Sequence, residues 1–263
     1  MAALTFDLWH TLIQLAPEAE DRYIGLQEAT LAEILRTSPP APGRGAERTM
    51  DPADAAHQAW SSALARKGQG APISELARVA ANHAGRRPEP ERWVAAIDTL
   101  VEAQPFEEVP GARDQLRRLV DEGYRIAVVS NLVGESGRSM RRVLERLDMA
   151  PFIESWALSE ELPWAKPAPE IFWKALEPIG TLPSDAVHFG DLGSDIHGAR
   201  AAGFRCSVLF QGARNYGALY SALSHTEDRI DPPPERVLSS WKELPPLLED
   251  LFSHDRPSAR ATK

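Results

Sequence analysis

The sequence predicts an α/β fold, a Rossmann-like parallel sheet into which an all-α segment is inserted. From Pro110 onward, short apolar runs alternate with stretches of helical spacing, which is typical of parallel strands joined by crossover helices. Between residues 15 and 104 the apolar residues recur at helical spacing and no strand pattern is found. We therefore expect a sheet domain of residues 1–14 and 105–252, a helical insertion of residues 15–104, and a flexible tail of residues 253–263.

The expected strands are short runs that are mostly apolar at consecutive positions, as in strands buried on both faces of a parallel sheet. Three of them end in polar residues: Asp7 follows the first, Ser130-Asn131 ends the second, and Asp191 follows the fourth. The expected strands are Ala2–Phe6, Tyr124–Asn131, Ile153–Leu158, Ala186–Phe189, Arg205–Phe210 and Arg236–Ser239. Because crossovers of this kind are right-handed, the carboxyl ends of the strands share one edge, where ligands of open α/β sheets bind.

The expected helices are defined by apolar residues three and four positions apart and by residues that start or stop a helix. Asp51 before Pro52 is an N-cap followed by proline at the first helical position, and Gly123 and Gly203 are stops. The sheet domain should contain helices over residues 110–121, 137–147, 169–176 and 195–202. The insertion should contain helices over residues 18–36, 52–66, 73–84 and 90–103.

Composition excludes several classes of protein. The chain has 263 residues, which is long for one hydrophobic core, and its 29 Lys and Arg residues against 38 Asp and Glu give a net charge of −9. This acidity argues against nucleic acid or an anionic membrane as a partner. A single cysteine forms no internal disulfide, and no apolar run approaches the roughly 20 residues of a membrane helix. We expect a cytoplasmic protein, a monomer or a homodimer, that acts on a small molecule.

The polar residues at the strand ends suit the chemistry of a phosphoryl group. A carboxylate such as Asp7 can attack an electrophilic phosphorus or carbon and form a covalent intermediate. A phosphoryl group beside Asp7, Asp191 and Asp195 needs compensating positive charge, which Lys166 and a hard divalent cation such as Mg²⁺ can supply. The Ser130 hydroxyl can hold a non-bridging oxygen. These residues together predict a Mg²⁺-assisted reaction at one edge of the sheet.

Four segments in chain order resemble the four motifs of the haloacid dehalogenase (HAD) superfamily. They are Phe6–Leu12, Val128–Asn131, Lys166–Phe172 and His188–Asp195. The resemblance covers nearly the whole chain, and it is closest to the subgroup that carries a helical cap after the first motif. It implies that the sheet is the HAD core and that the insertion is a C1-type cap.

The resemblance also implies an activity and a role for each matching residue. The expected activity is that of a Mg²⁺-dependent phosphatase acting on a small phosphorylated metabolite through an aspartyl-phosphate intermediate. Asp7 would be the nucleophile, with Lys166 and Ser130 as the other catalytic residues. Substrate phosphate would be held by Thr11, Ser130, Asn131 and Lys166. The metal would be held by Asp7, Asp191, Asp195 and the backbone carbonyl of Trp9.

One position departs from the family pattern. The phosphatases carry a second aspartate two residues after the nucleophile, as general acid and base, and Trp9 stands there instead. General acid–base help is worth roughly 10²–10⁴-fold, so we expect slower hydrolysis of good leaving groups rather than none. Two alternatives stay open. An aromatic residue at this position is also found in the dehalogenases, which predicts a 2-haloacid dehalogenase-like hydrolase. A lost acid is also compatible with a catalytically weak protein that binds a phosphorylated ligand for regulation. The retained Asp191 and Asp195 favour the phosphatase, because the dehalogenases use no metal.

Overall fold

The structure, a computed structural model, describes residues 2–42, 49–213 and 230–253. It contains a six-stranded parallel sheet in the order β5-β4-β1-β6-β7-β8. The strands are β1 (Ala3–Phe6), β4 (Arg125–Ser130), β5 (Ser155–Leu158), β6 (Ala186–Gly190), β7 (Cys206–Phe210) and β8 (Arg236–Leu238). The predicted α/β class and all six expected strands are confirmed, with ends that shift by one or two residues. The expected flexible tail lies outside the described residues from residue 254 onward.

The first strand lies in the middle of the sheet. Leu4 of β1 pairs with Ile126 of β4 on one side and with Val187 of β6 on the other. From β1 the chain moves outward through β4 to β5, and then returns to the other side of β1 for β6, β7 and β8. The strand order therefore reverses next to β1. At such a switch point the loops after the neighbouring strands diverge and leave a crevice at their carboxyl ends.

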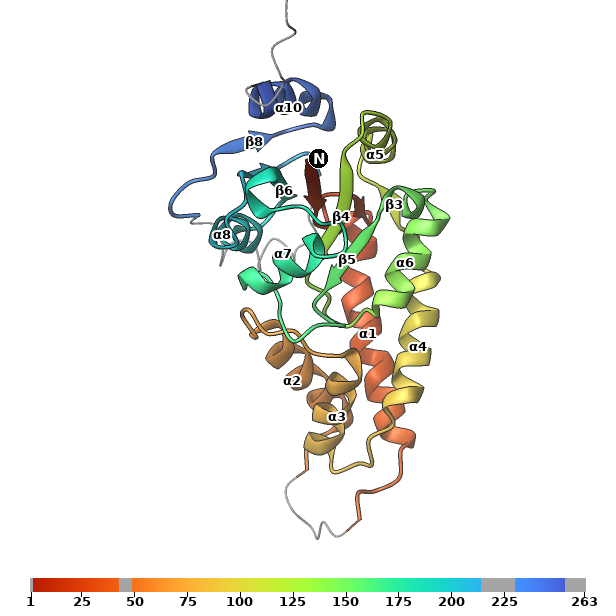
Figure 1. Cartoon of the computed structure of the whole chain (residues 1–263). Coiled ribbons are helices and arrows are strands. Elements are labelled where there is room, and N and C mark those ends of the chain that lie inside the picture. Colours follow the sequence, from red (N-terminus) through yellow and green to blue (C-terminus); the bar gives the residue numbers. More distant parts are fainter. Residues whose placement is uncertain (1, 43–48, 214–229, 254–263) are drawn as a thin grey trace, which may run out of the picture.

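Helices cover both faces of the sheet (Figure 1). They are α5 (Ala112–Asp121), α6 (Gly137–Arg146), α7 (Pro169–Leu176), α8 (Gly193–Ala201) and α10 (Leu244–Phe252). Successive side chains of a strand point to opposite faces. Leu4 accordingly packs in the cluster that includes Leu116 of α5, whereas Ala3 packs in the cluster that includes Ile171 of α7 and Ala199 of α8.

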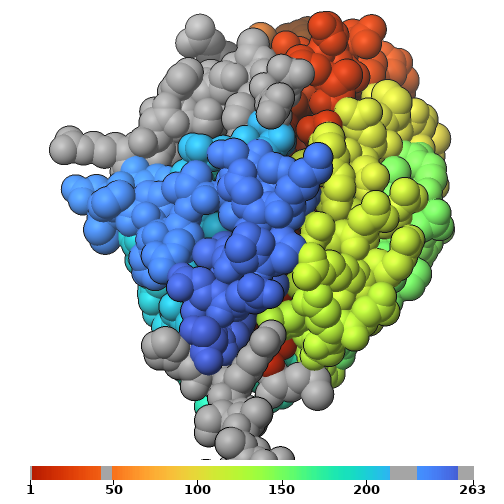
Figure 2. Space-filling view, turned by 90° about the horizontal axis from the view of Figure 1, so that it is seen from above, coloured from red at the N-terminus to blue at the C-terminus, as the bar shows by residue number. Residues whose placement is uncertain are grey.

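The C-terminal helix α10 was not predicted from the sequence. Two prolines occupy its first turn, where their missing N–H groups cost no hydrogen bond. Figure 2 shows the end of the molecule that it covers, with the C-terminal segment in blue beside the yellow-green surface that contains α5. The ring of Phe252 in α10 lies 5.9 Å from that of Tyr124, measured between centroids. The helix thus closes the sheet domain far from the carboxyl ends of the strands.

Four further helices form a separate layer, drawn below the sheet in Figure 1. They are α1 (Pro17–Thr37), α2 (Pro52–Leu64), α3 (Ile73–Ala84) and α4 (Pro90–Glu102), and we call them the helical segment. All four match helices expected from the sequence. As predicted, Asp51 caps α2, where its side chain accepts a hydrogen bond of 2.9 Å from the backbone N–H of Ala53. Within the described residues, no helix combines the length and the apolar character needed to cross a membrane.

Two very short strands flank the helical segment. β2 (Ile13–Gln14) and β3 (Glu107–Glu108) form an antiparallel pair that the sequence analysis did not predict. The Gln14 side chain also donates a hydrogen bond of 3.0 Å to the Glu107 carboxylate. The chain therefore leaves the sheet domain and returns to it at one place, only a few residues after β1. This fixes the base of the helical segment beside the carboxyl end of the central strand.

Candidate active site

Asp7, Lys166 and Asp195 form a buried ionic group at the carboxyl edge of the sheet. Lys166 Nζ lies 2.8 Å from Oδ1 of Asp7 and 2.7 Å from Oδ1 of Asp195. Asp7 directly follows β1, and its backbone N–H donates to the carbonyl of Phe189 in β6. Asp195 lies in the first turn of α8. Three segments far apart in sequence thus meet in one place, as the sequence analysis predicted.

The charges of this group stabilise one another. Burial disfavours the ammonium form of Lys166, but the adjacent carboxylates of Asp195 and Asp7 outweigh it and raise the pKa of Lys166 above its usual value. Burial likewise disfavours an ionised Asp195, but Lys166 and His188 outweigh it and hold the pKa of Asp195 below its usual range. The lysine therefore stays positive and Asp195 negative throughout the neutral pH range.

Asp195 is held in place from every side. Its Oδ1 lies 2.9 Å from Nε2 of His188, whose Nδ1 in turn lies 2.7 Å from the Thr5 hydroxyl. The backbone N–H of Leu192 donates to its Oδ2 at 3.0 Å. A Cβ atom at Gly190 would lie only 2.1 Å from the Asp195 Cγ, so a residue without a side chain is needed there. The sequence analysis gave His188 no role of its own. In the structure it orients a residue of the site, and its position two residues before Gly190-Asp191 is the only sequence signal of this role.

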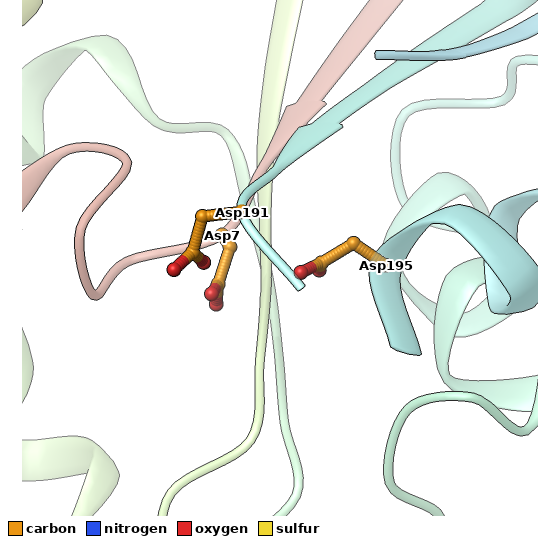
Figure 3. Close-up of side chains that lie close together, drawn as sticks. All are labelled: Asp7, Asp191 and Asp195. Carbon is orange, nitrogen blue, oxygen red and sulfur yellow. The ribbon is translucent and has the colours of Figure 1, made fainter. Parts of the chain in front are cut away.

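A third carboxylate completes an acidic cluster. Asp7, Asp191 and Asp195 each place one carboxylate oxygen within 4.8 Å of those of the other two. Figure 3 shows Asp7 and Asp191 side by side after neighbouring strands, with Asp195 reaching toward them from α8. A set of carboxylate oxygens at this spacing suits a hard divalent cation such as Mg²⁺. The three carboxylates predicted as metal ligands therefore lie close enough together to fit such an ion, while a contact from the Trp9 carbonyl stays a prediction.

Asn131 fixes the loop that carries Lys166. Its Oδ1 accepts a hydrogen bond of 2.7 Å from the backbone N–H of Lys166, and its Nδ2 donates to the Lys166 carbonyl at 3.0 Å. Both polar atoms of the amide are thus used within the protein. The side chain positions the lysine, while its predicted contact with phosphate stays a prediction.

The two hydroxyl residues predicted to bind phosphate are buried and do not line the cavity over Asp7. Ser130 ends β4 and Thr11 lies in the turn after β1, and both are buried. Among the described residues, neither hydroxyl has a hydrogen-bond partner. Neither residue lines the cavity over Asp7. Asn131, the residue after Ser130, does line this cavity. A role in phosphate binding stays a prediction for both.

Trp9 belongs to an aromatic cluster at the base of the helical segment. The centroid of its ring lies 5.3 Å from that of Phe106 and 6.0 Å from that of Tyr23 in α1. It also lines the cavity over Asp7. The neighbouring His10 is not among the residues that line this cavity, and its Nε2 lies 3.2 Å from a carboxylate oxygen of Glu20. The position of the expected acid is therefore filled by an apolar ring that packs against the helical segment.

A cavity of about 630 Å³ lies between the helical segment and the sheet domain. Asp7, Asn131 and Lys166 line it from the sheet domain. Glu135, in the loop after β4, also lines it, and burial raises the pKa of this carboxyl to about 7. Tyr23 of α1 donates a hydrogen bond of 3.3 Å to the Glu135 carboxyl. The sequence analysis missed Glu135, because an acidic residue in a loop gives no signal of its burial.

A family model for haloacid dehalogenase-like hydrolases matches residues 1–203, which include every residue of this site. The chain belongs to this family. The HAD resemblance inferred from the four sequence motifs is thereby confirmed.

Curated relatives of this HAD protein include several named as phosphatases. A glyceraldehyde 3-phosphate phosphatase of Pyrococcus furiosus is 36% identical over 61% of this chain and 62% of its own length. A phosphoglycolate phosphatase of Nitrosococcus oceani is 30% identical over 53% and 56%, and a ribulose-1,5-bisphosphate 5-phosphatase of Halopiger xanaduensis is 35% identical over 47% and 51%. The chain thus spans between about half and three fifths of the length of these relatives.

Solved structures share the HAD fold over nearly the whole chain. CbbY of Rhodobacter sphaeroides, crystallised with phosphate, has a TM-score of 0.61 at 18% identity, covering 93% of this chain and 97% of its own. A 2-haloacid dehalogenase of Pseudomonas syringae also has a TM-score of 0.61, at 23% identity, covering 95% and 99%. The fold is therefore shared by a protein crystallised with phosphate and by one named as a haloacid dehalogenase, and the choice between phosphate and carbon–halogen chemistry depends on the site.

Proposed function

We propose that this HAD protein is a Mg²⁺-dependent phosphatase that hydrolyses a small phosphorylated metabolite through an aspartyl-phosphate on Asp7. The observation that carries the proposal is the acidic cluster around Lys166. Three carboxylates lie close together there, and two of them pair with the one ammonium group, so a phosphate dianion could approach only if a cation offset the excess negative charge. The same excess would serve no purpose in a metal-free attack on carbon.

In the proposed reaction, Asp7 is the nucleophile and Lys166 supports it. A carboxylate oxygen of Asp7 attacks phosphorus, the bond from phosphorus to the ester oxygen breaks, and the departing alkoxide takes a proton from water. Water then attacks the aspartyl-phosphate, which releases inorganic phosphate and restores the Asp7 carboxylate. Lys166 holds the Asp7 carboxylate in place through their ion pair, and it offers positive charge to the phosphoryl oxygens.

The cation would be held mainly by Asp7 and Asp191. Both oxygens of Asp195 already accept hydrogen bonds, from Lys166 and His188 on one and from Leu192 on the other. We therefore expect Asp195 to act on the ion through water and to serve chiefly by orienting Lys166. When bound, Mg²⁺ would supply the charge that stabilises the phosphoryl group as its negative charge shifts.

Trp9 supports a second candidate, hydrolysis of a carbon–halogen bond. Its ring lines the cavity and offers no proton, so departure of a halide, which needs none, would suffer less than departure of an alkoxide. In that reaction Asp7 would attack carbon and expel halide. The acidic cluster weighs against it, because a haloacid is itself an anion and would meet the same repulsion.

The decisive experiment measures phosphate release from p-nitrophenyl phosphate and halide release from 2-chloropropionate. Each is assayed with Mg²⁺ and with a chelator, on the wild type, on Asp7→Asn and on the matched control Asp121→Asn, whose carboxylate is exposed at the end of α5. We expect Mg²⁺-dependent phosphate release by the wild type and the control, and none above background by Asp7→Asn. Activity that survives Asp7→Asn would refute the role of Asp7 as the nucleophile. Halide release that persists in chelator would establish the second candidate instead.

A further inference from the structure

The cavity over Asp7 is larger than a small sugar phosphate requires. Its volume of about 630 Å³ lies within the roughly 300–1,000 Å³ typical of sites that enclose drug-sized ligands. The phosphate of a substrate would occupy the end marked by Asp7 and Lys166. A leaving group of two or three carbons would leave most of the remaining space to water. The chemistry of the wall therefore indicates what else the cavity accepts.

The wall that faces the leaving group is mainly apolar. The helical segment contributes Trp60 and Leu64 from α2, and Ile73 and Leu76 from α3. The loop after β4 adds Leu132. Water released from such surfaces favours binding in proportion to the apolar area that a ligand covers. A hydroxylated sugar would lose hydrogen bonds to water along this wall and gain few in return.

The indole of Trp60 is a fixed part of this wall. A Cβ atom at Gly134 would lie only 1.8 Å from the Trp60 ring, so the ring rests directly on the backbone of the loop after β4. This contact joins α2 to the sheet domain across the cavity. Trp60 is 4% exposed, and its Nε1 has no hydrogen-bond partner among the described residues. The indole N–H is thus buried, and the ring presents mainly carbon to the cavity.

Gln27 of α1 is a second buried polar side chain beside the cavity. The residue is 0% exposed and lines the cavity, and its Nε2 donates to the carbonyl of Gly134 at 3.2 Å. Within the described parts of the chain, its Oε1 has no partner. Leaving a buried donor or acceptor without a hydrogen bond is unfavourable. Both atoms, Trp60 Nε1 and Gln27 Oε1, are buried beneath the wall, so the surface that a ligand meets there is mainly apolar.

Two positively charged side chains also line the cavity, and they are more exposed to solvent than its apolar wall. Arg66 and Lys67 follow the end of α2 and line the cavity, with Arg66 half-buried and Lys67 exposed. No ion pair joins either of them to another described residue. Exposed charges bind a second anionic group only weakly, although they draw anions toward the entrance. Their placement fits attraction of a phosphate ester better than recognition of a second phosphate.

We propose that the substrates are phosphate monoesters whose leaving group is apolar and about the size of an aromatic ring, held against Trp60 and Leu76. This inference rests on the phosphatase activity proposed above, and it narrows the substrate class of the same site. Small phosphate esters in which a second charged group replaces the apolar body are expected to bind more weakly.

The experiment measures binding of phosphonates, which are not hydrolysed, so it does not depend on turnover. Dissociation constants with Mg²⁺ are measured by calorimetry for 3-phenylpropylphosphonate, propylphosphonate and phosphonoacetate. We expect 3-phenylpropylphosphonate to bind at least tenfold more tightly than propylphosphonate, which differs from it only by the ring. Equal affinities, or tighter binding of phosphonoacetate, would overturn the inference. Hydrolysis of p-nitrophenyl phosphate is measured in parallel. Its absence would refute the proposed phosphatase activity, whereas the binding data would still test which class of ligand the cavity prefers.

A pair of variants locates the preference in the cavity. Leu76→Asn places an amide on the apolar wall and should lower the preference for 3-phenylpropylphosphonate over propylphosphonate at least threefold. Leu182→Asn makes the same change at a residue that is 67% exposed and does not line the cavity, and it should leave the ratio unchanged. An equal effect of both variants, or of neither, would place the ring outside the proposed position.

Discussion

Replacing Glu135 by Gln removes a carboxyl group whose burial makes the folded protein sensitive to pH. The pKa of Glu135 is about 7 in the folded protein, against 4.5 in the unfolded chain. Below pH 4.5 both states hold the proton, and stability has its full value. Between pH 4.5 and 7 the unfolded chain loses its proton first, so the free energy of unfolding falls as pH rises. Above pH 7 the loss is complete, and at about 1.4 kcal/mol for each pH unit it amounts to about 3 kcal/mol.

Glutamine cannot ionise, so Glu135→Gln should lack this loss. Its amide still accepts from Tyr23, but its NH₂ group meets the backbone N–H of Val133, which donates to Glu135 in the wild type at 3.1 Å. That mismatch lowers stability by a constant amount at every pH, about 1–3 kcal/mol. The informative quantity is therefore how the difference between variant and wild type changes with pH. From pH 5 to pH 8.5 the difference should shift by about 2 kcal/mol in favour of the variant.

Urea unfolding followed by tryptophan fluorescence at pH 5, 6, 7 and 8.5, in chelator, measures this difference. Glu145→Gln is the matched control, because its side chain is exposed on α6 and its difference from wild type should stay constant with pH. A difference for Glu135→Gln that varies by less than about 1 kcal/mol over this range would refute the reasoning, since burial would then not raise the pKa of this carboxyl.

Three further changes test the site. Gly190→Ala pushes a Cβ atom into Asp195. It should lower the rate of phosphate release from p-nitrophenyl phosphate at least a hundredfold, and it should also lower the melting temperature. A wild-type rate would contradict the packing argument. Trp9→Asp restores an acid and should raise turnover of propyl phosphate about a hundredfold with Mg²⁺, whereas an unchanged rate would mean that the proton comes from elsewhere. Lys166→Met removes the positive charge between the buried carboxylates of Asp7 and Asp195. It should lower stability in urea by about 3–5 kcal/mol in chelator, with partial recovery in Mg²⁺. No recovery would argue against a cation site.

Much of the fold and of the site could be predicted from local patterns. Asp7, Ser130 and Asp191 each follow an apolar run, and parallel strands bring such ends together whatever the rest of the chain does. The short strands β2 and β3 could not be predicted, because two residues show no periodicity and their pairing joins positions more than ninety residues apart. The same limit applies to Glu135, whose burial depends on helix α1 packing over it.

By itself, the sequence determined the α/β class, the order of strands and helices, the family motifs and the replacement of an acid by Trp9, because each is written in residues that are neighbours along the chain. The tertiary structure alone decided which atoms meet. It places the buried His188 against Asp195, directs both polar atoms of Asn131 to the backbone of Lys166, and places Trp60 against Gly134 beside an apolar cavity. Contacts of this kind depend on packing between segments distant in sequence, and the residue types alone do not specify it.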